Sequence, residues 1–227
     1  MTAFAADLPP DWALKRPKPI LQSTFDLLGA PLRMAAFPDA VSERLHLTSL
    51  RAERFAAVLP RLKGRVLDIG AGDNTLCRLY RQNATLLGAD PEDAANSIGV
   101  DVVDWNGQSV IIEDAASLPF PDQSFDTVCF IACINHIVNR VEALREARRV
   151  LRPGGRVIVT MIGRFIGTIG HAIWWYSEDK HRDVDHEEAM GLDDREVKMM
   201  LRQAGFEDLA TESFVYGLNR LYVARVG

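Results

Sequence analysis

The sequence lacks several features that would place it in common protein classes. Its 227 residues contain only three cysteines, Cys77, Cys129 and Cys133, and no CxxC pair. We therefore expect small buried thiols rather than a disulfide framework or a cysteine metal site. No apolar run approaches the roughly 18 residues that a membrane-spanning helix needs. The N-terminus has no basic start followed by an apolar run, so no signal peptide is predicted.

An excess of positive charge is also missing. The formal net charge is −5 at pH 7, from 26 basic and 31 acidic residues. A broad surface for nucleic-acid phosphates needs the opposite balance, so nucleic acid is not expected as a partner. Apolar residues make up 48% and charged residues 25% of the chain, as in ordinary globular proteins. We expect one soluble, cytoplasmic domain without stable membrane insertion.

The pattern along the chain indicates an α/β fold. Residues 1–19 are rich in proline and are expected to form a flexible arm, while residues 20–62 have the apolar spacing of amphipathic helices. From residue 64, short β-branched runs alternate with helical stretches, which is typical of a mainly parallel sheet flanked by helices. The strand candidates are 65–69, one of 85–89 and 97–103, 110–113, 125–131, 156–162, 207–214 and 219–226.

Two helices carry sequence signals for their ends. Asn139 with Glu142, and Asp193 with Glu196, have the spacing of a capping box. Gly205 is placed to end the second helix. No helix separates the two final strands, so we expect them to form an antiparallel pair at one end of the sheet.

Chemically distinctive residues follow several of the predicted strands, where open α/β sheets bind their ligands. The segment GRVLDIGAGDN, residues 64–74, places Asp68 in a buried strand just before Gly70, Ala71 and Gly72. An unpaired carboxylate is costly there, so Asp68 is expected to have a polar partner. The two glycines let a ligand approach the backbone closely. An acid follows the second strand, EDAASLPF follows the third and FIACINHIVN follows the fourth.

Six stretches, in this order, resemble a Rossmann-like S-adenosylmethionine (SAM)-dependent methyltransferase of the group that includes the ubiquinone/menaquinone-type enzymes. They are VLDIGAGDN, GVD, EDAASLPFPDQSFDTV, INHIVN, EARRVLRPGGRVIVTMI and LRQAGF. The resemblance implies a single domain with a seven-stranded, mainly parallel sheet. Residues 64–162 would bind SAM, whose product is S-adenosylhomocysteine. Residues 20–62 would form a helical cover, 163–190 a substrate lid, and 191–227 the last helix and strand pair.

The resemblance also implies roles for individual residues. Asp68 would accept bonds from the glycine-loop N–H groups and face the cationic amino end of SAM. The loop Gly70–Gly72 would pass along the methionyl and ribose portion. Asp114 and the backbone of Ala115 would read the adenine, and backbone near Ile131 would hold the methionyl amino group. For Asp68 and Asp114, capping of a turn is the plainer alternative.

Two acids compete to hold the ribose hydroxyls. Asp90 lies at the usual distance from the glycine motif. Asp101 lies in the better strand pattern, with Trp105 nearby as an apolar wall. Residues 91–100 have a poor helix pattern, which favours Asp101 and makes 82–96 an insertion.

Other residues are candidates for binding the methyl acceptor or for removing its proton. His136, where such enzymes often carry a histidine near the methyl group, and His171 are candidate bases; a helix-start histidine bonded to backbone is the alternative for His136. The candidate acceptor-binding residues are Trp174, Trp175, Tyr176 and Tyr216. Three adjacent aromatics suggest an apolar or aromatic small-molecule acceptor. The histidines and acids of 163–190 match no standard ligand spacing, so no metal is expected.

Two other functions stay open at this stage. A nicotinamide-dependent oxidoreductase needs G-x-G-x-x-G, but Thr75 occupies the place of the third glycine. A SAM-binding regulatory protein without catalysis is the other, because methyl transfer needs no obligatory catalytic side chain. The oligomeric state is open as well, with a homodimer as one alternative.

Overall fold

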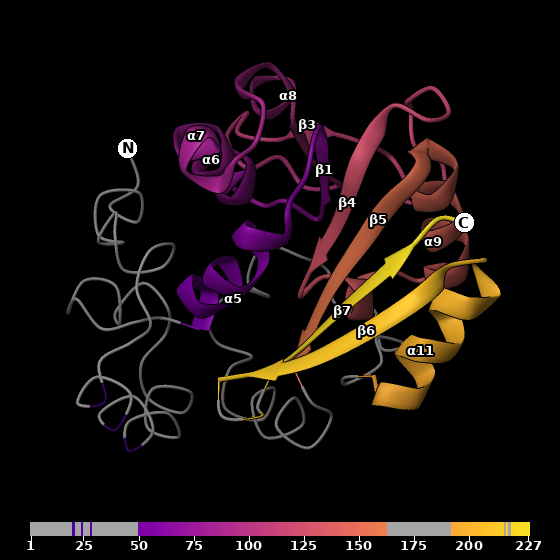
Figure 1. Ribbon diagram of the computed structural model, residues 1–227. Coiled ribbons are helices and arrows are strands. Elements are labelled where there is room, and N and C mark those ends of the chain that lie inside the picture. Colours follow the sequence, from indigo (N-terminus) through magenta and orange to yellow (C-terminus); the bar gives the residue numbers. More distant parts are fainter. Residues whose placement is uncertain are drawn as a thin grey trace.

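A twisted sheet with helices on both faces is the centre of the fold, as the computed structural model shows (Figure 1). The structure describes residues 50–162, 192–215, 217 and 219–227, together with residues 20, 24 and 28. The helices are α5 (Leu50–Val58), η1 (Leu59–Arg61), α6 (Thr75–Gln82), α7 (Ala84–Leu87), α8 (Pro91–Ala95), η2 (Ile134–His136), α9 (Arg140–Val150) and α11 (Asp194–Gln203). The strands are β1 (Val66–Ile69), β2 (Ile98–Asp101), β3 (Val110–Ile111), β4 (Phe125–Ile131), β5 (Leu151–Ile162), β6 (Glu207–Phe214) and β7 (Asn219–Arg225).

The strand order is β3-β2-β1-β4-β5-β7-β6. Strands β1 to β5 pair in parallel, whereas β7 runs antiparallel to both β5 and β6. The expected seven-stranded, mainly parallel sheet with a final antiparallel pair is therefore confirmed. Because the parallel strands share one direction, the residues that follow β1, β2 and β4 meet at the same edge of the sheet.

The sequence left two candidates for the second strand, residues 85–89 and residues 97–103. In the structure the strand is β2, Ile98–Asp101, which lies within the second candidate. The expectation of a poor helix after Asp90 is wrong, since Pro91–Ala95 form α8. The Asp90 carboxylate caps this helix, accepting from the backbone N–H groups of Glu92 (2.7 Å) and Asp93 (3.3 Å). Proline at the first helical position further favours the start of the helix.

The two predicted capping boxes have different outcomes. The Asp193 carboxylate accepts from the N–H groups of Arg195 (2.7 Å) and Glu196 (2.9 Å), and the Glu196 carboxylate accepts from the Asp193 N–H. This capping box at α11 is confirmed. Asn139 precedes α9, but its side chain makes no capping bond, so that prediction is wrong. Its φ of −92° and ψ of 62° depart from the extended backbone that capping residues adopt.

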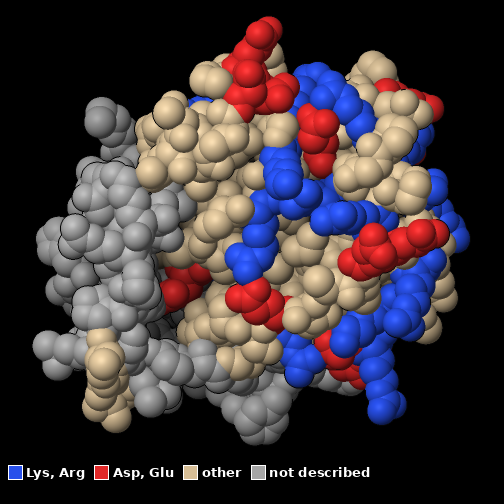
Figure 2. All heavy atoms as spheres, in the orientation of Figure 1, with Lys and Arg blue, Asp and Glu red and all other residues tan. Residues whose placement is uncertain are grey.

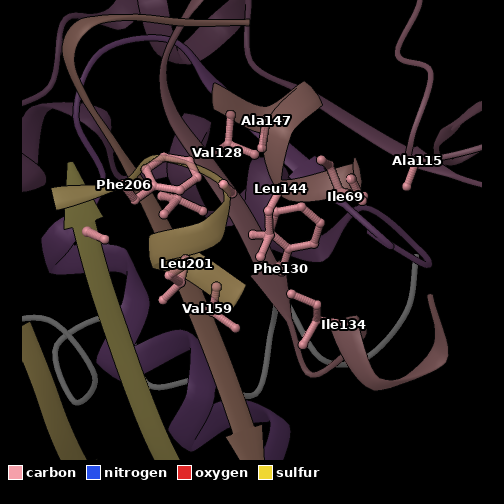
Figure 3. Close-up of a cluster of buried hydrophobic side chains, with 14 of the residues drawn as sticks. Ile69, Ala115, Val128, Phe130, Ile134, Leu144, Ala147, Val159, Leu201 and Phe206 are labelled. Atoms are coloured by element: carbon pink, nitrogen blue, oxygen red, sulfur yellow. The ribbon is translucent and has the colours of Figure 1, made fainter. Parts of the chain in front are cut away.

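Apolar side chains fill both faces of the sheet. On the side of α9 and α11, Phe130, Val159, Leu144, Leu201 and Phe206 belong to one buried cluster (Figure 3). The opposite face packs against α5, η1 and α6 through a second cluster, which includes Phe55, Val58, Leu76, Tyr80, Val66 and Ile158. Side chains alternate along a strand, so Asp68 lies on the same face as Val66, toward α5 and α6.

Charged side chains of both signs share the surface. On the face seen in Figure 2, lysine and arginine form a band with acidic residues beside it. The ion pairs include Arg61 with Glu212 and, at 2.6 Å, Arg152 with Asp126. Within the described ranges, no helix has the length and apolar character needed to cross a membrane.

Candidate active site

The glycine loop folds over the end of the neighbouring strand. The N–H groups of Gly70 and Ala71 both donate to the Val100 carbonyl, at 2.9 and 3.0 Å. The N–H of Gly72 donates to Asp101 Oδ2 at 2.8 Å. The expected bonds from these N–H groups to Asp68 are therefore not formed. The loop is held by β2 instead, because β1 and β2 are parallel neighbours that end at the same edge.

Asp68 is a buried acid with an unpaired oxygen. Its exposed fraction is 2%, and Oδ1 has no hydrogen-bond partner among the described residues. Burial raises the pKa of this carboxyl well above its ordinary value, the Asp101 and Asp73 charges add to the rise, and the Arg51 guanidinium opposes it. A buried acceptor without a donor is unfavourable for the fold. It is well suited to a ligand that brings a cationic N–H group.

Asp101, and not Asp90, lies beside the glycine loop. Its two carboxylate oxygens accept from the N–H groups of Gly72 (2.8 Å) and Val103 (3.0 Å). Each oxygen has a second lone pair, so the side chain can also accept hydroxyl groups from a ligand. Asp90 is exposed and serves as the cap of α8.

Three glycines of this region differ in the space around them, since Gly70 and Gly99 are crowded and Gly72 is not. Gly70 has a φ of +71°, and a Cβ there would lie 2.6 Å from the Cβ of Cys133. At Gly72 the nearest atom to such a Cβ is Trp105 Cε2 at 3.9 Å, so this part of the backbone is open. The sequence analysis missed Gly99, where a Cβ would lie 2.7 Å from that of Ala71. The glycine of the GVD stretch was the signal for this close approach.

An arginine of α5 binds the residues that directly follow the glycine loop. Arg51 pairs with the Asp73 carboxylate and donates to Thr75 Oγ1 at 2.9 Å. Asp73 Oδ1 also accepts from the hydroxyl of Thr75 at 2.7 Å, and Arg78 donates to the same hydroxyl at 2.6 Å. The sequence reasoning missed Arg51, because a contact between residues this far apart in the chain leaves no local pattern.

The segment after β4 lies at the same edge. Ala132 has a φ of +56°, a sparsely populated region for a residue with a side chain, and its N–H donates to the carbonyl and hydroxyl of Thr160, both at 3.1 Å. The preceding Ile131 is the last residue of β4. His136 is half-buried in η2, with Nε2 3.0 Å from Asn135 Nδ2.

The cysteine next to the loop is not a nucleophile. The Cys133 thiol donates to the Ile69 carbonyl at 3.0 Å. Burial, together with the charges of Asp68 and Asp101, raises the pKa of this thiol well above its ordinary value. The thiol stays protonated at neutral pH, in agreement with a packing role.

Asp114 starts the turn that follows β3. Its Oδ1 accepts from the Ala116 N–H at 2.8 Å, and the neighbouring Ala115 is buried. This oxygen therefore caps the turn, which is the alternative role that the sequence offered for Asp114. The segment is fastened to α9, since Glu146 accepts from the Leu118 N–H at 3.0 Å.

Several candidates lie outside the described residues. They are His171, Trp174, Trp175, Tyr176 and Tyr216, along with the arm 1–19, the expected lid 163–190 and most of the expected cover. In the part of the chain that is described, no three or more histidine, cysteine or acidic side chains form a group suited to a metal ion.

The strand order is that of a Rossmann-like α/β fold, in which ligands bind beyond the carboxyl ends of the parallel strands. Residues 67–159 match the protein family described as a methyltransferase domain. The chain is 35% identical over 128 residues to the ubiquinone/menaquinone biosynthesis C-methyltransferase UbiE of Bordetella avium. That match covers 54% of this chain and 49% of the relative, so the chain spans about half of that protein's length. The UbiE protein of Azotobacter vinelandii is 29% identical over 71% of this chain and 73% of its own.

A solved structure shares the fold. A SAM-dependent methyltransferase from Thermotoga maritima has a TM-score of 0.55 and 23% identity, over 77% of this chain and 88% of its own. Taken together with the family match, these findings support SAM-dependent methyltransferase activity, with SAM as the cofactor. The residues present fit this cofactor, because among the residues that the structure describes Asp68 Oδ1 is a buried acceptor without a donor and no atom lies closer than 3.9 Å to the place of a Gly72 Cβ.

Proposed function

We propose that this enzyme transfers the methyl group of SAM to a small, apolar or aromatic molecule. Asp68 accepts from the cationic amino end of the cofactor, and the loop Gly70–Gly72 lies along its methionyl and ribose part. Asp101 accepts from the ribose hydroxyls. Asp114 and the backbone of Ala115 bind the adenine.

The residues after β4 belong to the reacting end of this proposed site. SAM supplies a methyl group on a positively charged sulfur, which is a good leaving group. The protein therefore acts mainly by aligning the acceptor and excluding water. Backbone near Ile131 holds the amino-acid end, and His136 takes the proton from an acceptor that needs a base.

The nature of the acceptor is supported by two observations of different kinds. The similar proteins from Bordetella avium and Azotobacter vinelandii are named for C-methylation in ubiquinone and menaquinone biosynthesis. The run Trp174–Tyr176 supplies three adjacent aromatic side chains in the segment expected to form the lid. Both favour an aromatic acceptor over a highly charged one.

The proposal rests on two acids, Asp68 and Asp101, that lie at one edge of the sheet in different environments. Asp68 is buried, and its Oδ1 is unpaired within the described part of the chain. Asp101, at the end of the neighbouring strand, accepts from the Gly72 N–H. A ligand that spans both acids needs a cationic group at one end and hydroxyl groups further along. SAM has both.

Calorimetric titration with SAM and S-adenosylhomocysteine tests the proposed cofactor-binding residues. We expect Asp101→Ala to weaken both by about ten-fold or more, since hydrogen bonds to a charged group are worth about 1.5–3 kcal/mol. Asp90→Ala is the matched control, because it removes an acid that only caps α8. No binding by the folded wild-type protein, or equal losses in the two variants, contradicts the assignment.

Methyl transfer from labelled SAM to a panel of small apolar and aromatic acceptors tests the catalytic half. His136→Ala should slow turnover while leaving the affinity for S-adenosylhomocysteine unchanged. Unchanged turnover would remove His136 from the reaction. A panel in which only charged acceptors react would overturn the proposed acceptor class.

A further inference from the structure

Asn219, the first residue of β7, is a buried amide at the carboxyl edge of the sheet. It is 0% exposed and lies opposite Ile162, the last residue of β5. Strand β7 runs antiparallel to β5 and lies between β5 and β6 (Figure 1), so it begins at the edge where the parallel strands end. The segment 163–190, which is expected to form the substrate lid, starts directly after Ile162 in the sequence. Asn219 therefore lies at the part of this edge where the acceptor is expected.

The side chain of Asn219 lies on the same face of the sheet as Asp68. Side chains alternate along a strand. Leu221 belongs to the cluster that packs against α5, whereas Arg220 between them pairs with α11 on the other face. A contact with α5 agrees with this orientation, because Arg54 Nε donates to Asn219 Oδ1 at 3.4 Å.

The bond from Arg54 determines which end of the amide is left without a partner. A guanidinium only donates hydrogen bonds, so the amide oxygen faces Arg54 and the NH2 group points away from it. Nδ2 of Asn219 has no hydrogen-bond partner in the described part of the chain. A buried donor without an acceptor is costly, and native structures keep few of them. An oxygen atom of a ligand would satisfy this donor.

The cofactor does not account for this donor. Among the described residues, the other fully buried side-chain atoms without a partner are Asp68 Oδ1, Asn74 Oδ1 and Ser109 Oγ. These three lie on β1, directly after the glycine loop, and directly before β3. In the strand order, β4 and β5 separate β7 from β1. Asn219 thus calls for a ligand other than SAM, and a methyltransferase has one, its methyl acceptor.

The surroundings of Asn219 indicate the chemistry of that ligand. Phe214, opposite Asn219 on β6, and Leu221 both belong to the apolar packing against α5. One N–H donor beside apolar side chains suits an apolar molecule that carries an oxygen atom. The Arg54 guanidinium polarises the amide through its oxygen, which strengthens the N–H group as a donor.

We propose that Asn219 is an acceptor-binding residue whose Nδ2 donates a hydrogen bond to an oxygen atom of the methyl acceptor. Arg54 holds the amide in the orientation that presents this donor. The acceptor class then narrows to apolar or aromatic molecules that carry a hydroxyl or carbonyl oxygen. The inference rests on the proposed methyl transfer to an apolar or aromatic molecule.

Ligand-observed NMR titration of the S-adenosylhomocysteine complex tests the inference with para-cresol and para-xylene, two probes of the same shape that differ by one hydroxyl group. We expect the wild-type complex to bind para-cresol about ten-fold more tightly, because para-xylene leaves the buried donor unpaired. Asn219→Leu removes the donor and should reduce this preference to about two-fold or less. Its affinity for S-adenosylhomocysteine should equal that of the wild type, since Asn219 lies outside the proposed cofactor site.

Asn83→Leu is the matched control, because it makes the same replacement where Nδ2 already donates to the Leu79 carbonyl at 2.8 Å. It should keep the preference for para-cresol. An Asn219→Leu complex that keeps the full preference overturns the inference, and so does a wild-type complex that binds both probes equally. Binding of neither probe contradicts the apolar acceptor of the proposed function as well, so the two failures are distinguishable.

Asn219→Asp is a second variant with the shape of the native side chain. It places an oxygen atom where the donor was, beside the Arg54 guanidinium, and should also lose the preference for para-cresol. If Asn219→Leu fails to fold, this variant decides the question, and a retained preference there overturns the inference.

Discussion

Replacing Asp68 by asparagine should make the cofactor-free protein more stable, although Asp68 is part of the proposed site. The carboxyl is 2% exposed and its Oδ1 has no partner among the described residues. Its pKa is raised well above the ordinary value by burial first, and then by the Asp101 charge. Asp68→Asn removes the ionisable group with almost no change of shape, so the folded state no longer bears the cost of ionising this buried carboxyl or of keeping it protonated.

The size of the effect follows from the burial. Asparagine keeps an oxygen at this place, so the gain comes from the ionisation alone, and each pH unit between the unfolded and the raised folded pKa costs the wild-type protein about 1.4 kcal/mol. In a chain of 150–250 residues, each kcal/mol moves Tm by about 2–4 °C. We therefore expect Asp68→Asn to raise the Tm of the cofactor-free protein by about 3–5 °C for each pH unit over which the folded carboxyl keeps the proton that the unfolded chain has lost. The same variant should bind SAM more weakly, since it no longer offers a charged acceptor to the amino group.

The pH dependence of the stability difference between Asp68→Asn and the wild type checks the sign of this effect independently. Because the pKa of Asp68 is raised in the folded state, the folded protein holds this proton at pH values where the unfolded chain, with the ordinary aspartate pKa of about 3.9, has lost it. This group therefore lowers the stability of the wild-type protein as the pH rises above that value toward the raised folded pKa. The advantage of Asp68→Asn should be absent near pH 3 and grow toward pH 7.

Thermal and urea unfolding of the two proteins over this pH range measures the difference. Asp101→Asn is the control of opposite sign, because that carboxylate accepts two backbone N–H groups and should lose stability on substitution. An Asp68→Asn protein that is less stable than wild type at pH 7, or a difference that does not change with pH, would refute the reasoning.

Three further changes have expected outcomes. Gly99→Ala brings a Cβ to 2.7 Å from that of Ala71, so it should lower the free energy of unfolding by about 1–3 kcal/mol, as overpacking does, and weaken SAM binding; wild-type values in urea unfolding would contradict this. Arg51→Ala removes the ion pair to Asp73 and should weaken SAM binding several-fold in calorimetry, with partial recovery in Arg51→Lys; equal affinities would exclude a positioning role. Asp193→Ala removes the cap of α11 and should cost about 1 kcal/mol in unfolding while SAM affinity stays unchanged, so a loss of affinity there would argue against the site as placed.

Strong local patterns predicted most of the sheet. The run 125–131 became β4 with the same bounds, because a buried strand next to a turn leaves a clear signal in the sequence. The run 207–214 became β6 with the same bounds, although most of its residues are exposed. Asp101 ends β2 whereas Asp90 caps α8, and the assignment of the ribose to Asp101 stays a prediction. The poor helix pattern of 91–100, which favoured Asp101, was in part a wrong prediction. Asp90 followed by Pro91 is a helix-start signal, and α8 begins there.

The tertiary part of the site could not be predicted in the same way. The glycine-loop N–H groups bond to Val100 and Asp101, which depends on how β1 and β2 pair and not on the loop itself. Arg51 reaches Asp73 from α5 across a separation that no periodic pattern spans. Ala132 has a positive φ without being a glycine, and its sequence neighbours give no warning of it.

The position of β7 has a consequence for how the enzyme is made. This strand comes last in the described chain, yet it lies between β5 and β6, which cannot pair with each other. While the ribosome is still adding residues before Asn219, β5 has an open edge and β6 has no neighbour in the sheet. Such unpaired edges attract other chains and chaperones. The sheet is therefore complete only once β7 has left the ribosome and paired, and until then β5 and β6 stay open to such contacts.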